Sequence, residues 1–185
     1  MRPLLLLLLY ALGTGRAPAK EKPPTTYSIP LPPRADFSSL EWLVGEWVGK
    51  TTGRSPQGEI RLSVEYALDK RFMIFREEIT LAPTKSASAT RESWIGVLSG
   101  GGPDAGFLLR TYSSTGFIIN YRVSMEGPEV HFSPEGGEQP PPGWLFRRTA
   151  RRSESGDLNE TVQMAPPNKP FFDYYTATLS RAGPR

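Results

Sequence analysis

Short segments with strand character follow one another along almost the whole chain after residue 46. They are rich in β-branched and aromatic residues, and Gly, Pro, Ser, Asn and Asp separate them. Within residues 60–66, apolar and polar side chains alternate, as expected for a strand with one buried face. We therefore expect about ten strands, near Trp47–Thr51, Ile60–Tyr66, Phe72–Leu81, Arg91–Leu98, Phe107–Tyr112, Phe117–Ser124, Glu129–Ser133, Trp144–Arg151, Leu158–Met164 and Phe171–Arg181.

The connections between these segments are short, and this limits how the strands can pair. Parallel neighbours need long crossovers, whereas antiparallel neighbours can be joined by a few residues. An open antiparallel sheet of this size would leave two unpaired edges, and closing the sheet removes both. The prediction is an all-β fold: a single antiparallel up-and-down barrel of about ten strands. A two-sheet sandwich with Greek-key connections is the alternative.

One short helix is predicted before the first strand. Ser38 is a suitable N-cap, and Glu41 three residues later completes the pattern of a capping box. We expect this helix to run from about Ser39 to Val44.

The N-terminus has the pattern of a secretory signal. Arg2 precedes an apolar run of about nine residues, too short to cross a bilayer, and small residues follow it up to Ala19. We predict a cleaved signal peptide over 1–19, a Pro-rich extended linker over 20–35 and the barrel domain over 36–182, in a periplasmic or secreted protein without stable membrane insertion after cleavage. An uncleaved interfacial anchor is the alternative.

Charge and composition exclude several kinds of function. The chain has 22 Lys and Arg against 19 Asp and Glu, and the predicted signal peptide contains Arg2 and Arg16 but no acid, so 20 basic residues remain against 19 acidic ones. This near balance gives no reason to expect a nucleic-acid partner. The chain has no Cys and one His, which excludes thiol chemistry, disulfides and Cys/His zinc sites.

A motif at the predicted first strand resembles a known group of barrels. Leu-Glu-Trp-Leu-Val at 40–44 is followed by Gly45-Glu46-Trp47 and then by strands only. This layout resembles the lipocalin-like (calycin) barrels, in particular bacterial lipocalin-like domains of unknown function and, more distantly, nitrobindin. In that superfamily a Gly-x-Trp motif opens the first strand, and Gly45 and Trp47 match it. The resemblance implies that the Trp47 indole closes one end of the barrel, a structural role that fits its large buried area.

Alternation along two central strands defines two possible inner faces. One face, called the drier face below, has mainly apolar side chains. The other carries Arg110, Tyr112, Asn120 and Arg122, which could bind an anion. Because burying unpaired arginines is costly, we expect the drier face inside. The predicted function is binding of a small hydrophobic molecule in the lumen without catalysis, by Phe107, Leu109, Phe117, Ile119 and Tyr121, with Trp94 or Trp144 near a mouth.

Two alternative functions use other residues. No cofactor is predicted, but the resemblance to nitrobindin, where a barrel histidine ligates haem iron, makes His131 a haem candidate. An enzyme could use an inward carboxylate at Glu77 or Glu78, with Arg110 and Arg122 beside it. Both glutamates, and the cluster Arg147, Arg148, Arg151 and Arg152, are nevertheless expected to be solvated strand ends.

A third alternative is an interaction module. Its barrel would be filled by its own side chains, and the Pro-rich loop at 134–143 would be its contact surface.

Overall fold

The computed structural model describes residues 28–53, 57–85, 88–101, 106–138 and 142–183. The predicted signal peptide (1–19) and the linker up to residue 27 lie outside the described residues. The chain divides into Met1–Pro32 and Pro33–Arg185, and every strand belongs to the second unit. In the part of the chain that is described, no helix has the length and apolar character needed to span a membrane.

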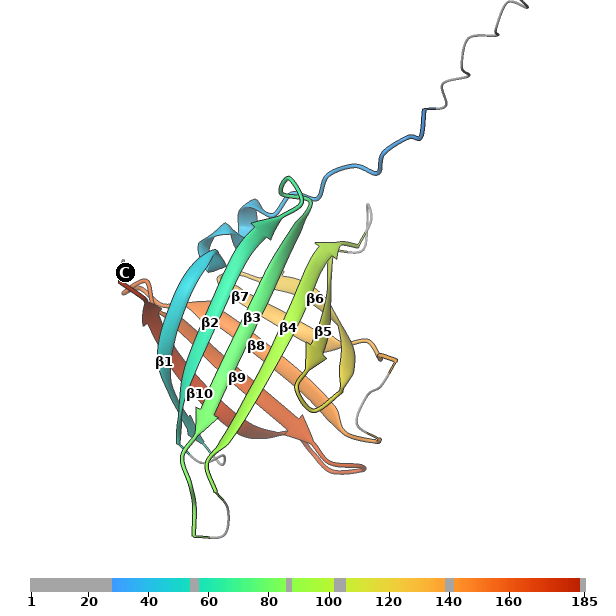
Figure 1. Cartoon of the computed structure of the whole chain (residues 1–185). Helices are drawn as coiled ribbons and strands as arrows, with labels where there is room; N and C mark the ends of the chain where they lie inside the picture. Colours follow the sequence, from blue (N-terminus) through green and yellow to red (C-terminus); the bar gives the residue numbers. More distant parts are fainter. Residues whose placement is uncertain (1–27, 54–56, 86–87, 102–105, 139–141, 184–185) are drawn as a thin grey trace, which may run out of the picture. The chain divides into compact units, whose positions relative to one another are not determined.

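Ten antiparallel strands form a closed barrel, which confirms the predicted fold class (Figure 1). Each strand pairs with its neighbours in the sequence, and β1 pairs with β10 to close the sheet. The sandwich alternative is therefore wrong. The strands are β1 (Gly45–Gly53), β2 (Gly58–Ala67), β3 (Phe72–Leu81), β4 (Thr90–Gly100), β5 (Phe107–Ser113), β6 (Ile118–Glu126), β7 (Glu129–Pro134), β8 (Leu145–Arg152), β9 (Leu158–Ala165) and β10 (Phe172–Arg181).

The segment before β1 is the 3₁₀ helix η1 (Ser38–Leu43), which buries Leu40 and Leu43. The predicted capping box is wrong, because no side chain caps η1 by a hydrogen bond from the N-cap position. Instead, the Asp36 carboxylate accepts a hydrogen bond from the Ser38 backbone N–H at 2.9 Å. This hydrogen bond lowers the pKa of Asp36. The short polar side chain that starts the helix is thus two residues earlier than expected.

The Trp47 indole lies in the barrel end next to η1, with 1% of its surface exposed. Its Nε1 donates a hydrogen bond to the Leu43 carbonyl at 2.8 Å. The Arg181 guanidinium lies 4.4 Å from the Trp47 ring centroid and donates hydrogen bonds to the carbonyls of Trp42 and Val44. The last strand therefore fixes both the indole and the end of η1.

Gly45 makes the tight junction between η1 and β1 possible. Its φ is +134°, and a Cβ built there would lie 2.2 Å from Arg181 Nη1. A side chain at this position would be strained by the backbone and would displace the arginine.

Candidate functional site

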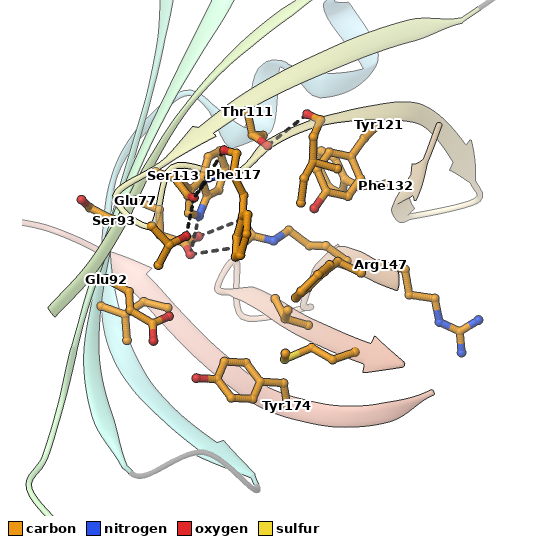
Figure 2. Close-up of a pocket in the computed structure, with 18 of the residues that line it drawn as sticks. Glu77, Glu92, Ser93, Thr111, Ser113, Phe117, Tyr121, Phe132, Arg147 and Tyr174 are labelled. Atoms are coloured by element: carbon orange, nitrogen blue, oxygen red, sulfur yellow. Dashed lines mark hydrogen bonds and ion pairs between the residues drawn. The ribbon is translucent and has the colours of Figure 1, made fainter. Parts of the chain in front are cut away.

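A cavity of about 290 Å³ opens inside the barrel at the end opposite η1 (Figure 2). The register of β5 shows this arrangement. Phe107 at its start stacks on Phe37, which precedes η1, with ring centroids 5.4 Å apart, whereas Thr111 and Ser113 near its end line the cavity. The lumen therefore has a packed half and an open half.

The walls of the cavity are mainly apolar. Aromatic and aliphatic side chains from seven strands, β3 to β9, and from the turn before β6 contribute to them: Ile79, Trp94, Leu109, Phe117, Ile119, Tyr121, Phe132, Phe146, Val162 and Met164. Five of the residues predicted to bind a ligand are among the lining residues, namely Trp94, Leu109, Phe117, Ile119 and Tyr121. The drier face of β5 and β6 is thus the inner one.

Two residues predicted to bind a ligand lie elsewhere. Phe107 is in the packed half because it stands at the η1 end of β5. Trp144 precedes β8, is 36% exposed and is not a lining residue. Neither position could be assigned before the end that η1 closes was known.

The polar face of β5 and β6 points outward. Arg110 forms an ion pair with Glu138, and Arg122 forms one with Glu135. These pairs lie on the outside of the barrel. The internal cluster of Arg110, Arg122 and Glu77 or Glu78 that the enzyme alternative requires is therefore not formed.

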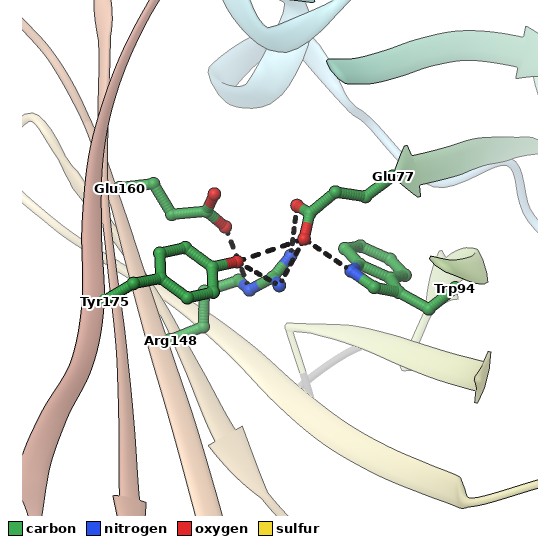
Figure 3. A network of polar contacts seen from close by, with 5 residues as sticks. All are labelled: Glu77, Trp94, Arg148, Glu160 and Tyr175. Carbon is green, nitrogen blue, oxygen red and sulfur yellow. Dashed lines mark hydrogen bonds and ion pairs between the residues drawn. The ribbon is translucent and has the colours of Figure 1, made fainter. Parts of the chain in front are cut away.

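A different polar cluster lies inside the barrel, centred on Arg148 (Figure 3). Arg148 Nη1 lies 2.9 Å from Glu77 Oε2, and Nη2 lies 3.0 Å from Oε1, so the pair is bidentate. Trp94 Nε1 donates to Glu77 Oε1 at 2.8 Å, and the Tyr175 hydroxyl donates to the same oxygen at 3.0 Å. On the other side, Arg148 Nε lies 2.9 Å from Glu160 Oε1. We call these five residues the lumen network.

The lumen network spans the barrel. β3, which carries Glu77, is five strands away from β8, which carries Arg148, in both directions around the closed sheet. The ion pair therefore bridges opposite walls. Glu77, Arg148 and Tyr175 also line the cavity, so the network forms its floor.

Burial changes the acid–base properties of the network. Burial raises the pKa of Glu160 to about 8; Arg148 opposes this change and Glu77 adds to it. Glu160 Oε2 has no hydrogen-bond partner among the described residues, so ionisation would leave a bare anionic oxygen in the interior. For Arg148, burial lowers the pKa, but Glu160 and Glu77 raise it more, and the net pKa is well above the ordinary value. At neutral pH Arg148 is therefore a cation and Glu160 is mostly protonated.

The prediction that Glu77 and Arg148 are solvated strand ends is wrong. Their side chains are 1% and 17% exposed. Each charge would be costly to bury alone, but the partner on the opposite wall offsets much of that cost. The neighbouring residue Glu78 does point outward, where it forms an ion pair with Arg91.

Sequence reasoning missed Glu160 and Tyr175. Glu160 lies between Leu158 and Val162 on the apolar face of β9, and a glutamate in such a row is the signal that could have found it. A β-bulge explains why Tyr175 was missed, because the register of β10 against β9 shifts between Asp173 and Tyr175 and interrupts the alternation of inward and outward residues. The extra residue lets both Tyr174 and Tyr175 line the cavity.

His131 lies on the outer face of β7. Its neighbours Val130 and Phe132 are buried, and its Nε2 lies 3.6 Å from carboxylate oxygens of Glu126 and Glu129. It is not a lining residue of the cavity. His131 is therefore not placed to hold a haem iron in the lumen. Among the described residues, no group of three or more His, Cys, Asp or Glu is arranged to hold a metal ion.

The fold and the site together define a ten-stranded antiparallel barrel, closed at one end by η1 and Trp47 and hollow at the other. No protein-family model matches the sequence, and no curated protein matches it either. The crystal structure of Rv2717c from M. tuberculosis is similar, with a TM-score of 0.58 and 16% sequence identity over 80% of this chain and 97% of that one. This similarity supports the barrel fold and is consistent with a lipocalin-like barrel.

Proposed function

We propose that this protein is exported and that it binds a small, mainly apolar molecule in the cavity without transforming it. One observation carries the proposal: a cavity with aromatic and aliphatic walls inside a closed barrel. Pockets of this kind, with few polar groups, are typical of small-molecule binding sites. Support for export comes from the signal-like pattern of residues 1–19.

The size of the cavity limits the ligand. An apolar cavity of about 150 Å³ accommodates benzene. The present cavity, about 290 Å³, has nearly twice that volume. A ligand of roughly a dozen non-hydrogen atoms, such as a substituted arene, would fit.

The lumen network favours binding over catalysis. The two oxygens of Glu77 already accept hydrogen bonds from Trp94, Arg148 and Tyr175, which leaves this carboxylate poorly placed as a general base. Glu160 is not a lining residue of the cavity. The cavity also argues against a barrel filled by its own side chains.

Filling the cavity tests the proposal. Ile119 lines it, and the adjacent Ile118 lies on the outer face of β6, opposite Tyr112 of β5. We expect isopentylbenzene to bind the wild type, as measured by a rise in melting temperature and by changes in tryptophan fluorescence. Ile119→Trp should weaken binding at least about tenfold, while Ile118→Trp should leave the dissociation constant unchanged.

Circular dichroism must show that both variants keep the barrel. If the folded wild type binds none of a set of arenes and alkanes of this size, the proposed function is wrong. Equal binding by Ile118→Trp and Ile119→Trp would place the bound probe outside the cavity and would also contradict it.

A further inference from the structure

The Tyr121 hydroxyl is an unused polar group in a mainly apolar wall. Tyr121 lines the cavity, and Figure 2 shows its ring beside Phe132. Its hydroxyl makes no hydrogen bond to any residue in the described part of the chain. Burial raises the pKa of Tyr121, whereas the charge of Arg148 lowers it and that of Glu77 raises it. The hydroxyl is therefore a neutral donor within electrostatic range of the lumen network.

Arg148 supplies a second donor. Contacts with Glu77, Glu160 and Tyr175 use four of its five N–H groups, and within the described residues the second N–H of Nη1 has no partner. The Arg148 side chain is 17% exposed, against 1% for Glu77 and 3% for Glu160. A ligand in the cavity can therefore contact the Arg148 guanidinium, whereas the carboxylates of Glu77 and Glu160 are almost fully buried.

The charge of Arg148 is already balanced. Glu77 binds it in a bidentate pair, and Glu160 lies against its Nε. A carboxylate ligand would be a further acid around one guanidinium, and it would lose its hydration on entering the cavity. A neutral acceptor has a much smaller desolvation cost and can use the same two donors.

We propose, on the basis of the function proposed above, that the cavity selects neutral molecules with a carbonyl oxygen, which accepts hydrogen bonds from the Tyr121 hydroxyl and from Arg148. The apolar remainder of the ligand lies against the aromatic walls. Fatty acids and other apolar carboxylates are discriminated against.

Three nearly isosteric probes test this selection. They are 4-phenyl-2-butanone, which has the carbonyl; 3-phenylpropanoate, which replaces its terminal methyl by an anionic oxygen; and isopentylbenzene, which replaces the carbonyl oxygen by a methyl group. At pH 7 the wild type should bind the ketone roughly tenfold more tightly than isopentylbenzene and at least as much more tightly than the carboxylate, as measured by calorimetry or fluorescence titration.

Tyr121→Phe keeps the ring and removes the donor. It should weaken ketone binding by roughly three- to tenfold and leave isopentylbenzene binding unchanged, a split that a general change in packing would not produce. The matched control is Tyr112→Phe, on the exposed outer face of β5, which should change neither dissociation constant.

The possible outcomes separate the two proposals. If the apolar probe binds as tightly as the ketone, or if Tyr121→Phe weakens both probes equally, the carbonyl selection is wrong while binding of apolar molecules stands. Tightest binding of the carboxylate also overturns the selection. If none of the three probes binds the folded protein, the proposed function fails, and the selection fails with it.

Discussion

Removing the charge of Arg148 should strongly destabilise the barrel. Arg148→Met keeps an unbranched side chain of similar length but removes the bidentate pair with Glu77 and the contact with Glu160. It also removes the guanidinium that lies 4.4 Å from the Trp94 ring centroid. Two buried carboxyls would remain without a cation. Breaking a buried ion pair in this way costs about 3–5 kcal/mol, which corresponds to a fall in melting temperature of roughly 6–20 °C for a chain of this size.

The loss should depend on pH in a defined direction. Without Arg148, two carboxyls would be buried with no cation beside them, and burial of a carboxyl favours its protonated form. The native state then binds more protons than the unfolded state, and stability falls as the pH rises from about 4.5 towards 8. Urea unfolding should therefore show a small difference between wild type and Arg148→Met near pH 4.5 and a larger one near pH 8.

Two further variants make the test specific. Arg147→Met, at the adjacent exposed position, should change stability by less than about 1 kcal/mol. Adding Glu77→Gln and Glu160→Gln to Arg148→Met removes all three ionisable groups and should recover most of the lost stability and abolish its pH dependence. If Arg148→Met costs less than about 1 kcal/mol, or if the triple variant is no more stable than the single one, our account of the network is wrong.

Three other changes test the closed end of the barrel at Trp47 and Gly45, and the lumen network. Trp47→Ala should lower the free energy of unfolding by about 3–5 kcal/mol in thermal or urea unfolding, whereas Trp144→Ala, at an exposed position, should lower it by less than about 1 kcal/mol. Equal losses would contradict the role of Trp47 in closing the barrel end. Gly45→Ala should cost about 1–3 kcal/mol because of its positive φ and the contact with Arg181; an unchanged melting temperature would refute this reasoning. The wild type should lose stability as the pH rises from 4.5 to 8, because folding raises the pKa of Glu160 to about 8 and the native state binds the extra proton; Glu160→Gln should flatten this dependence, and parallel curves for the two proteins would contradict it.

The barrel could be predicted from the sequence because its signals are local. Alternation over residues 60–66 and the turn residues between runs need no knowledge of distant contacts, and the bounds expected for β3, Phe72–Leu81, are those observed. Details set by tertiary packing were not predictable. The start of η1 uses Asp36 rather than Ser38, and the bulge at Tyr174 depends on how β10 meets β9.

The walls of the site were predictable and its floor was not. Alternation on β5 and β6 identifies Leu109, Ile119 and Tyr121 as inward, because one face is clearly drier than the other. For Arg148, the same reasoning considers one charge without a partner. Burying such a charge is costly, so the local pattern predicts an exposed side chain. The partner that reverses this balance, Glu77, is 71 positions away in the sequence. Only the closed register brings the two together.

The width of the barrel explains why a charged layer lies across its middle. Side chains can fill the interior of an eight-stranded barrel, whereas ten strands enclose more space than inward side chains alone can fill. η1 and Trp47 fill one end, and long side chains from opposite walls meet at Glu77 and Arg148 to close off that packed half. The remaining space is the cavity. The side chains that set its depth are thus also those that decide which polar group a ligand meets at the floor, so a change in the network would alter cavity size and ligand preference together.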